Sequence, residues 1–112
     1  MKYALLIYPA REVYSSLSED ELRTMTSEYV QLTQAEGVYA SEQLEATETA
    51  TTVRSENGRP LITDGPFANT KEVVGGFYLL DVENLDAALE FAARIPAVRI
   101  GGAVEVHRVA ER

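Results

Sequence analysis

The chain has 112 residues, of which 46% are hydrophobic and 25% are charged, so its composition is that of a globular protein and not of a disordered or collagen-like chain. It holds no cysteine, which excludes disulfide scaffolds, thiolate metal sites and cysteine nucleophiles. Eighteen acidic and ten basic residues give a net charge of −8, which repels nucleic-acid phosphates and anionic lipids. We therefore expect one domain over residues 1–112 that binds neither nucleic acid nor membrane.

The opening segment is predicted to be neither a membrane span nor a secretion signal. Its longest apolar run, Ala4-Leu5-Leu6-Ile7, is far too short to cross a bilayer. Lys2-Tyr3 followed by an early Pro9 does not match a signal peptide. We expect a cytoplasmic protein of bacterial type.

The chain begins with a predicted strand and a predicted helix. Residues 2–8 are aromatic and aliphatic and stop at Pro9, which predicts the strand. Ser18 and Glu21 have the spacing of a capping box, which predicts a helix that starts at Ser18 and runs to Glu36. Gly37 follows in the position of a left-handed C-terminal cap. The apolar residues of this helix recur at helical spacing: Leu22, Met25, Tyr29, Leu32 and Ala35.

The middle of the chain has strand and turn signals. Residues 38–44 and the threonine-rich residues 47–54 are predicted strands. Asn57-Gly58 is a strong hairpin turn signal, which returns the chain into a strand at 61–63. An irregular connector, residues 64–72, leads into the apolar run 73–82, a further strand.

A second helix and a last strand complete the chain. Asn84 is predicted to cap the helix and Pro96 to end it. Residues 103–109 alternate as a final strand. The buried stripe of the helix is predicted to comprise Leu85, Ala88, Leu89, Ala92 and Ile95.

This order of elements predicts an α+β fold, a ferredoxin-like βαββαβ arrangement with a hairpin extension. Residues 3–8 and 76–80 are apolar at nearly every position, so both faces of these strands need cover. Two helices cover only one face. We therefore expect a homodimer in which two sheets stack face to face, as a dimeric α+β barrel, and enclose a pocket between them.

Familiar catalytic and metal-binding patterns are absent from the sequence. There is no nucleophile elbow, phosphate-binding glycine loop or dinucleotide fingerprint. The single histidine, His107, is predicted to be a surface or partly packed residue of the last strand. The carboxylates Glu42, Glu45 and Glu48 indicate a solvated acidic surface and not a cation site. We expect no metal and no cofactor.

The connector Asp64-Gly65-Pro66-Phe67 has two interpretations. It combines a carboxylate, a residue free to take positive φ, a residue with fixed φ and an apolar side chain. In the first interpretation it is an ordered turn in which Asp64 caps local amides and Phe67 anchors the loop in the core. In the second, Asp64 and Lys71 converge at the mouth of a pocket, where burial and mutual charge tune them for proton transfer or ligand binding.

The segment Thr63-Asp64-Gly65-Pro66-Phe67-Ala68-Asn69-Thr70-Lys71-Glu72 resembles the D-G-P-F-A-E-T-K-E signature of the YCII-related proteins, in the subgroup named for its DGPF motif. Asn69 replaces the usual glutamate. The resemblance also covers residues 1–8, 50–54, 75–78 and 92–96. It implies a dimeric α+β barrel. The histidine of the histidine–aspartate pair found in some YCII-like proteins is missing here, so that pair is not carried over.

Two functions follow as hypotheses. The first is a homodimer that binds a small organic molecule between its sheets, with catalysis an open question; Asp64 and Lys71 are the candidate catalytic residues, and Tyr8, Phe67 and Tyr78 are the candidate pocket wall. The second is a non-enzymatic regulatory or protein-interaction module. The resemblance implies it, because genes of the DGPF subgroup often lie beside those of extracytoplasmic-function sigma factors.

Overall fold

The computed structural model describes residues 1–67 and 72–112. Its main sheet has four antiparallel strands in the order β2-β5-β1-β6, which is the strand order of a ferredoxin-like fold. The mixed α+β class is therefore confirmed. The strands of this sheet are β1 (Lys2–Tyr8), β2 (Val38–Gln43), β5 (Gly76–Asp81) and β6 (Ala103–Arg108).

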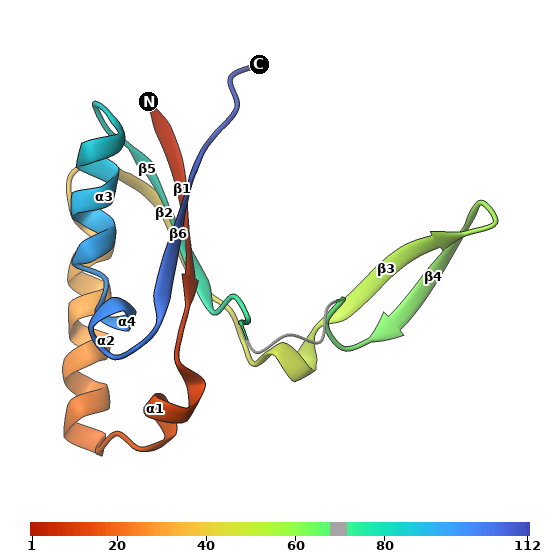
Figure 1. Ribbon diagram of the computed structural model, residues 1–112, viewed down its shortest axis with the longest axis horizontal. Coiled ribbons are helices and arrows are strands. Elements are labelled where there is room, and N and C mark those ends of the chain that lie inside the picture. The colour runs from red at the N-terminus through yellow and green to blue at the C-terminus, as the bar shows by residue number, and fades with distance from the viewer. Residues whose placement is uncertain (68–71) are drawn as a thin grey trace.

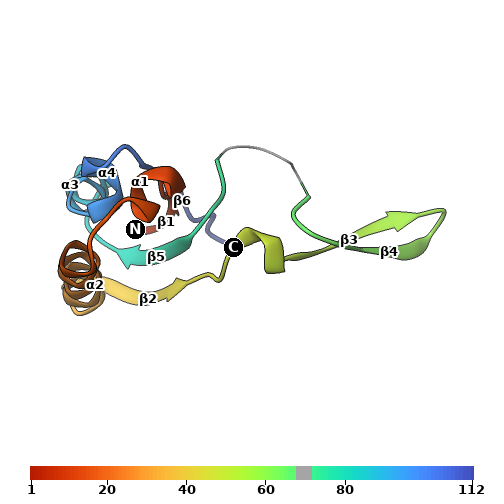
Figure 2. The ribbon, with the colours of Figure 1, turned by 90° about the horizontal axis from the view of Figure 1, so that it is seen from below.

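Two helices, α2 (Glu19–Thr33) and α3 (Leu85–Ala93), cover one face of this sheet. Figure 1 shows them as one layer beside the strands, and Figure 2 shows the same layer end-on. Two short helices, α1 (Arg11–Ser15) and α4 (Pro96–Arg99), lie in the connections. None of the helices in the described part of the chain is long and apolar enough to cross a membrane.

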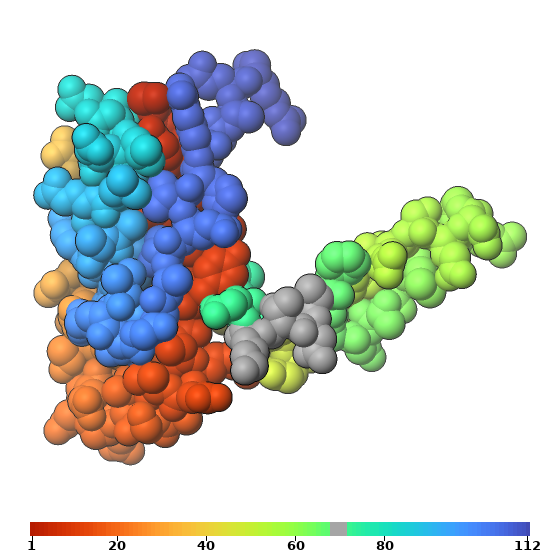
Figure 3. All heavy atoms as spheres, in the orientation of Figure 1, coloured from red at the N-terminus to blue at the C-terminus, as the bar shows by residue number. Residues whose placement is uncertain are grey.

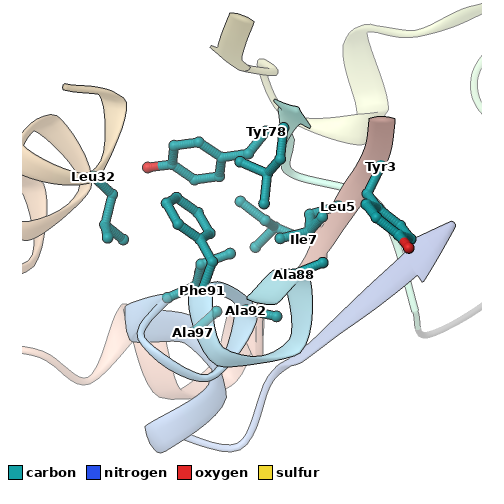
Figure 4. Close-up of a cluster of buried hydrophobic side chains, with 11 residues drawn as sticks. Tyr3, Leu5, Ile7, Leu32, Tyr78, Ala88, Phe91, Ala92 and Ala97 are labelled. Atoms are coloured by element: carbon teal, nitrogen blue, oxygen red, sulfur yellow. The ribbon is translucent and has the colours of Figure 1, made fainter. Parts of the chain in front are cut away.

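The core lies between the helices and the inner side of the sheet. Tyr78 of β5 meets Phe91 of α3 edge to face, with ring centroids 5.3 Å apart (Figure 4). Leu5 and Leu80 on the central strands are fully buried. The remaining buried residues of this cluster are Tyr3, Ile7, Leu32, Ala88, Ala92, Ile95 and Ala97.

The predicted start of α2 is confirmed, and its predicted end is too late. Ser18 accepts a hydrogen bond from the Glu21 amide at 3.1 Å, and the Glu21 carboxylate accepts one from the Ser18 amide at 3.1 Å. The helix ends at Thr33, not at Glu36. Gly37 has the expected left-handed backbone, with φ of 92°. It lies in the turn just before β2, where a Cβ would come within 2.9 Å of the carbonyl oxygen of Asp81.

The predicted buried stripe of α3 is partly wrong. Asn84 caps the helix as predicted, since its Oδ1 accepts from the Ala87 amide at 3.0 Å. Leu85 and Leu89, however, are 49% and 46% exposed, and Phe91 is buried instead. The helix is turned so that the Phe91 ring packs on Tyr78, which points the two leucines outward.

The segment between β2 and β5 forms a projecting hairpin of β3 (Thr51–Glu56) and β4 (Arg59–Asp64). We call residues 51–64 the hairpin arm. Asn57 and Gly58 have φ of 52° and 78°, so the predicted turn is confirmed as one with two left-handed residues. The strand predicted from residue 47 starts later, because Thr47–Thr49 forms a 3-10 turn. The arm is a separate two-stranded sheet that extends from the domain on the side away from the helices (Figures 1 and 2).

Candidate functional site

The face of the main sheet opposite the helices carries apolar side chains in its centre. Side chains alternate along β1, so Tyr3, Leu5 and Ile7 face the helices and the residues between them face outward. The register pairs Leu6 with Phe77 and Ala4 with Leu79, and all four are half-buried. We call this outward surface the open face. It also includes Tyr8, Ala40, Glu105 and His107.

A polar cluster stands at the β6 side of the open face. Glu105 and His107 are two positions apart on β6, so their side chains lie on the same face. His107 Nε2 lies 2.6 Å from Glu105 Oε1. The Tyr8 hydroxyl donates to the same carboxylate oxygen at 3.4 Å, because Tyr8 is the diagonal neighbour of Glu105 across the β1–β6 pair. We call these three residues the Tyr8–Glu105–His107 cluster.

The cluster alters the acidity of two of its members. The hydrogen bond with His107 is the main cause that lowers the pKa of the Glu105 carboxyl, and the charge of His107 and the Tyr8 hydroxyl add to it. Partial burial raises the pKa of the Tyr8 hydroxyl, and the negative charge of Glu105 raises it further. Glu105 therefore stays ionised as an acceptor while Tyr8 stays protonated as a donor.

An open hollow of about 610 Å³ adjoins Tyr8, between the edge of the main sheet and the base of the arm. Its lining includes Gln43, Thr47, Pro66 and Val74. The hollow lies beside the open face, so a ligand that covers the apolar centre of that face has room beyond Tyr8. This volume is within the range of small-molecule sites.

The structure places the predicted site residues in different parts of the molecule. Tyr8 lies on the open face and lines the hollow. Tyr78 is 2% exposed on the opposite side of the sheet, where its hydroxyl donates to the carbonyl of Tyr29 at 2.9 Å. Asp64 is exposed at the end of β4. Phe67 is 73% exposed, with the Arg54 guanidinium 5.3 Å from its ring, so it does not anchor the loop in the core.

Lys71 lies outside the described residues. The structure does not bring the four described candidates together, and the roles of all five residues in a ligand site stay predictions. Sequence reasoning missed Glu105 and the contact it makes with His107. The available signal was their spacing of two within a predicted strand, which places both side chains on one face.

The described residues contain no group of three or more histidine, cysteine, aspartate or glutamate side chains that could hold a metal ion. Glu42 and Glu45 are exposed, and Glu48 pairs with Arg11 at 2.9 Å.

Comparisons with known proteins place the chain in a family. The family model of the YCII-related domain matches residues 1–111. The chain is also 38% identical over 96 residues to an uncharacterized protein of Rhizobium meliloti (strain 1021), in an alignment that covers 82% of this chain and 77% of that protein. The match to the family model spans nearly the whole chain, including the four strands of the main sheet and both long helices. The chain therefore belongs to the family of YCII-related domains.

Proposed function

We propose that this protein is a cytoplasmic homodimer that binds a small organic molecule between two stacked sheets, as a dimeric α+β barrel, and transfers a proton to or from it. The observation that carries the proposal is the Tyr8–Glu105–His107 cluster beside the apolar centre of the open face. We also assign the chain to the DGPF subgroup on its Asp64-Gly65-Pro66-Phe67 segment.

The apolar centre of the open face supports the stacking of two copies. Leu6, Phe77 and Leu79 form a continuous patch across two neighbouring strands, and the helices of the same chain lie on the other side of the sheet. Covering these side chains removes apolar surface from water at about 25 cal/mol per Å². A second copy supplies such cover through the same face, as a two-fold interface requires.

The chemistry of the cluster supports proton transfer. An imidazole whose partner nitrogen is fixed by a carboxylate is a common general acid or base near neutral pH. Glu105 fixes the His107 ring, and the Tyr8 hydroxyl holds the carboxylate in place. The ligand class that fits is a small molecule with an apolar body and one group that gains or loses a proton at His107. Asp64 and Lys71 stay in the proposal as secondary polar residues.

Two measurements test this proposal. Light scattering after gel filtration at micromolar concentration should return about twice the 12.3 kDa chain mass for the parent protein. Leu79→Glu places a charge in the apolar patch and should reduce the measured mass to that of a monomer. A monomeric parent protein would refute the dimer. The matched control is Leu89→Glu, because Leu89 is 46% exposed on α3, on the other side of the molecule.

Ligand binding is tested by calorimetric titration with a panel of small phenols and carboxylic acids. A compound that binds the parent protein should bind His107→Gln and Glu105→Gln at least about tenfold more weakly. Arg108→Gln is the control, since Arg108 lies on the same strand with the opposite side-chain direction. Equal affinity of the parent and both cluster variants would remove the cluster from the site.

A regulatory module that contacts another protein, such as an extracytoplasmic-function sigma factor, is the second candidate. The observation in its favour is the arm, which exposes Val53 and Ile62 at 65% and 67%. Purified sigma factor should then form a stable complex with the parent protein and not with Ile62→Glu. If no complex forms while a small molecule binds, this candidate is rejected.

A further inference from the structure

The two faces of the hairpin arm differ in chemistry. The register pairs Val53 with Ile62 and Ser55 with Pro60, which places these four side chains on one face. We call them the apolar arm face. Its two central side chains, Val53 and Ile62, are 65% and 67% exposed, and the nearest charge on this face is Asp64 at the base. Alternation of apolar and polar residues is typical of a strand pair with one covered face.

The opposite face of the arm is suited to water. Glu56 pairs with Arg59 across the strands, so opposite charges lie side by side. Arg54 lies next to Leu61 in the register and stacks over the Phe67 ring at 5.3 Å. The charged side chains of this face therefore have neighbours of opposite charge or an aromatic ring close by, whereas no other part of the arm covers the apolar arm face.

The arm does not pack on its own domain. Figure 3 shows it standing clear of the main sheet along its length. The radius of gyration is 15.9 Å, against about 13 Å for a compact chain of this length. A two-stranded hairpin without further packing is only marginally stable in water, so the arm needs a covering surface from another molecule.

We propose that the apolar arm face docks on a second copy of this chain, so that the two arms of the dimer each hold the partner. The inference deepens the proposed function and rests on its stacked sheets. A second sheet stacked on the open face lies about 10 Å away, and strands of six residues are about 20 Å long, so an arm that projects on that side reaches past the partner's sheet.

The area of the interface favours a second copy over an unrelated partner. Four strands of six or seven residues present a flat face of about 400 Å², so two stacked sheets bury about 800 Å². Stable specific interfaces bury at least about 1,200 Å². Each apolar arm face buries about 200 Å² of its own surface and about 200 Å² of the partner's surface. Two arms therefore add about 800 Å², which raises the total buried area to about 1,600 Å². The arms supply the area that the sheets alone lack.

The test compares two substitutions on opposite faces of the same strand. Ile62→Glu places a charge on the apolar arm face, and Leu61→Glu places the same charge on the other face, next to Arg54. Analytical ultracentrifugation over a dilution series should show that Ile62→Glu raises the dimer Kd at least about tenfold, because both arms of the dimer are changed. Leu61→Glu should leave it within about threefold.

Leu79→Glu separates this inference from the proposed function. If Leu79→Glu is monomeric and Ile62→Glu dimerises as tightly as the parent, the docking of the arms is refuted and the stacked sheets stand. If Leu79→Glu leaves the dimer intact, the stacked sheets are refuted, and the docking of the arms, which rests on them, is refuted as well. A monomeric parent protein refutes both.

Hydrogen exchange gives a second measurement that needs no substitution. In the parent protein, the amides of β3 and β4 should become more protected when the concentration rises above the dimer Kd. Protection that does not change with concentration means that the arms stay free in the dimer, which overturns the inference and leaves the arm available to another protein.

Discussion

His107 Nε2 and Glu105 Oε1 lie 2.6 Å apart on the open face of the main sheet, although both side chains are 55% exposed. The contact exists because two residues of one strand separated by a single position point to the same side. It gives the last strand of the fold a polar pair beside the apolar residues Ala4 and Leu6 of β1.

This contact predicts the acidity of Glu105. In His107→Leu the pKa of the Glu105 carboxyl should rise, since the hydrogen bond with His107 is the largest cause of its lowered value and leucine has no donor. A pH titration followed by carbon-13 NMR of the carboxyl carbon measures it. Arg108→Gln also removes a basic residue from β6 but on the other face, so it should move this pKa less. An unchanged pKa in His107→Leu would show that the two side chains do not pair in solution.

The capping box predicts the stability of α2. Ser18→Ala should lower the free energy of unfolding by about 1 kcal/mol, because the Glu21 amide loses its acceptor. Urea unfolding measures the change. Ser27→Ala, at an exposed position within the same helix, is the control and should be neutral or slightly stabilising. If the two variants unfold alike, Ser18 does not cap the helix.

The ion pair between α2 and α4 predicts a dependence of stability on pH. Arg99 donates two hydrogen bonds to the Glu28 carboxylate, one of 2.7 Å from Nη1, which lowers the pKa of Glu28 below 4.5. The pair therefore stabilises the fold at neutral pH, and this contribution is lost as the pH falls through the lowered pKa.

Glu28→Gln should then cost about 0.5–1 kcal/mol at pH 7, because the pair is partly exposed to solvent. The difference from the parent protein should shrink below about pH 4. Urea unfolding at both pH values measures it, with the exposed Glu90→Gln as control. A stability difference between Glu28→Gln and the parent protein that does not depend on pH would contradict the ion pair as its cause.

The buried hydroxyl of Tyr78 is predicted to stabilise the fold, so its removal should lower the free energy of unfolding. Burial raises the pKa of Tyr78 to about 12, so the hydroxyl remains a donor to the Tyr29 carbonyl at all working pH values. Tyr78→Phe keeps the ring against Phe91 and removes this donor, which should cost about 1 kcal/mol. Thermal unfolding measures it, and Tyr39→Phe, at a position 48% exposed, should unfold like the parent. No loss in Tyr78→Phe would mean that water replaces the donor.

Local signals in the sequence determined the first strand, the capping box at Ser18 and the turn at Asn57-Gly58. These features depend on residues that are neighbours in the chain. They are a proline that ends a strand, a serine side chain that accepts from the amide three residues later, and a residue pair that accepts positive φ. The family match rests on the sequence as well.

The tertiary structure alone decided which face each strand residue occupies. Residues 76–80 are apolar at nearly every position, so the pattern did not distinguish the side of Tyr78 from the side of Phe77. The register with β1 and the helices α2 and α3 put Tyr78 in the core. Side chains alternate with a period of two, so a difference of one position separates a core residue from a residue of the open face.

The same reason explains the candidate site. Tyr8 and Glu105 are 97 residues apart in the chain, and only the pairing of β1 with β6 makes them neighbours. Asp64 and Phe67 belong to the segment that resembles a family signature, but a motif does not specify the direction in which its hairpin leaves the domain. The chain determined its elements through local contacts, while contacts between distant strands determined where its polar groups meet.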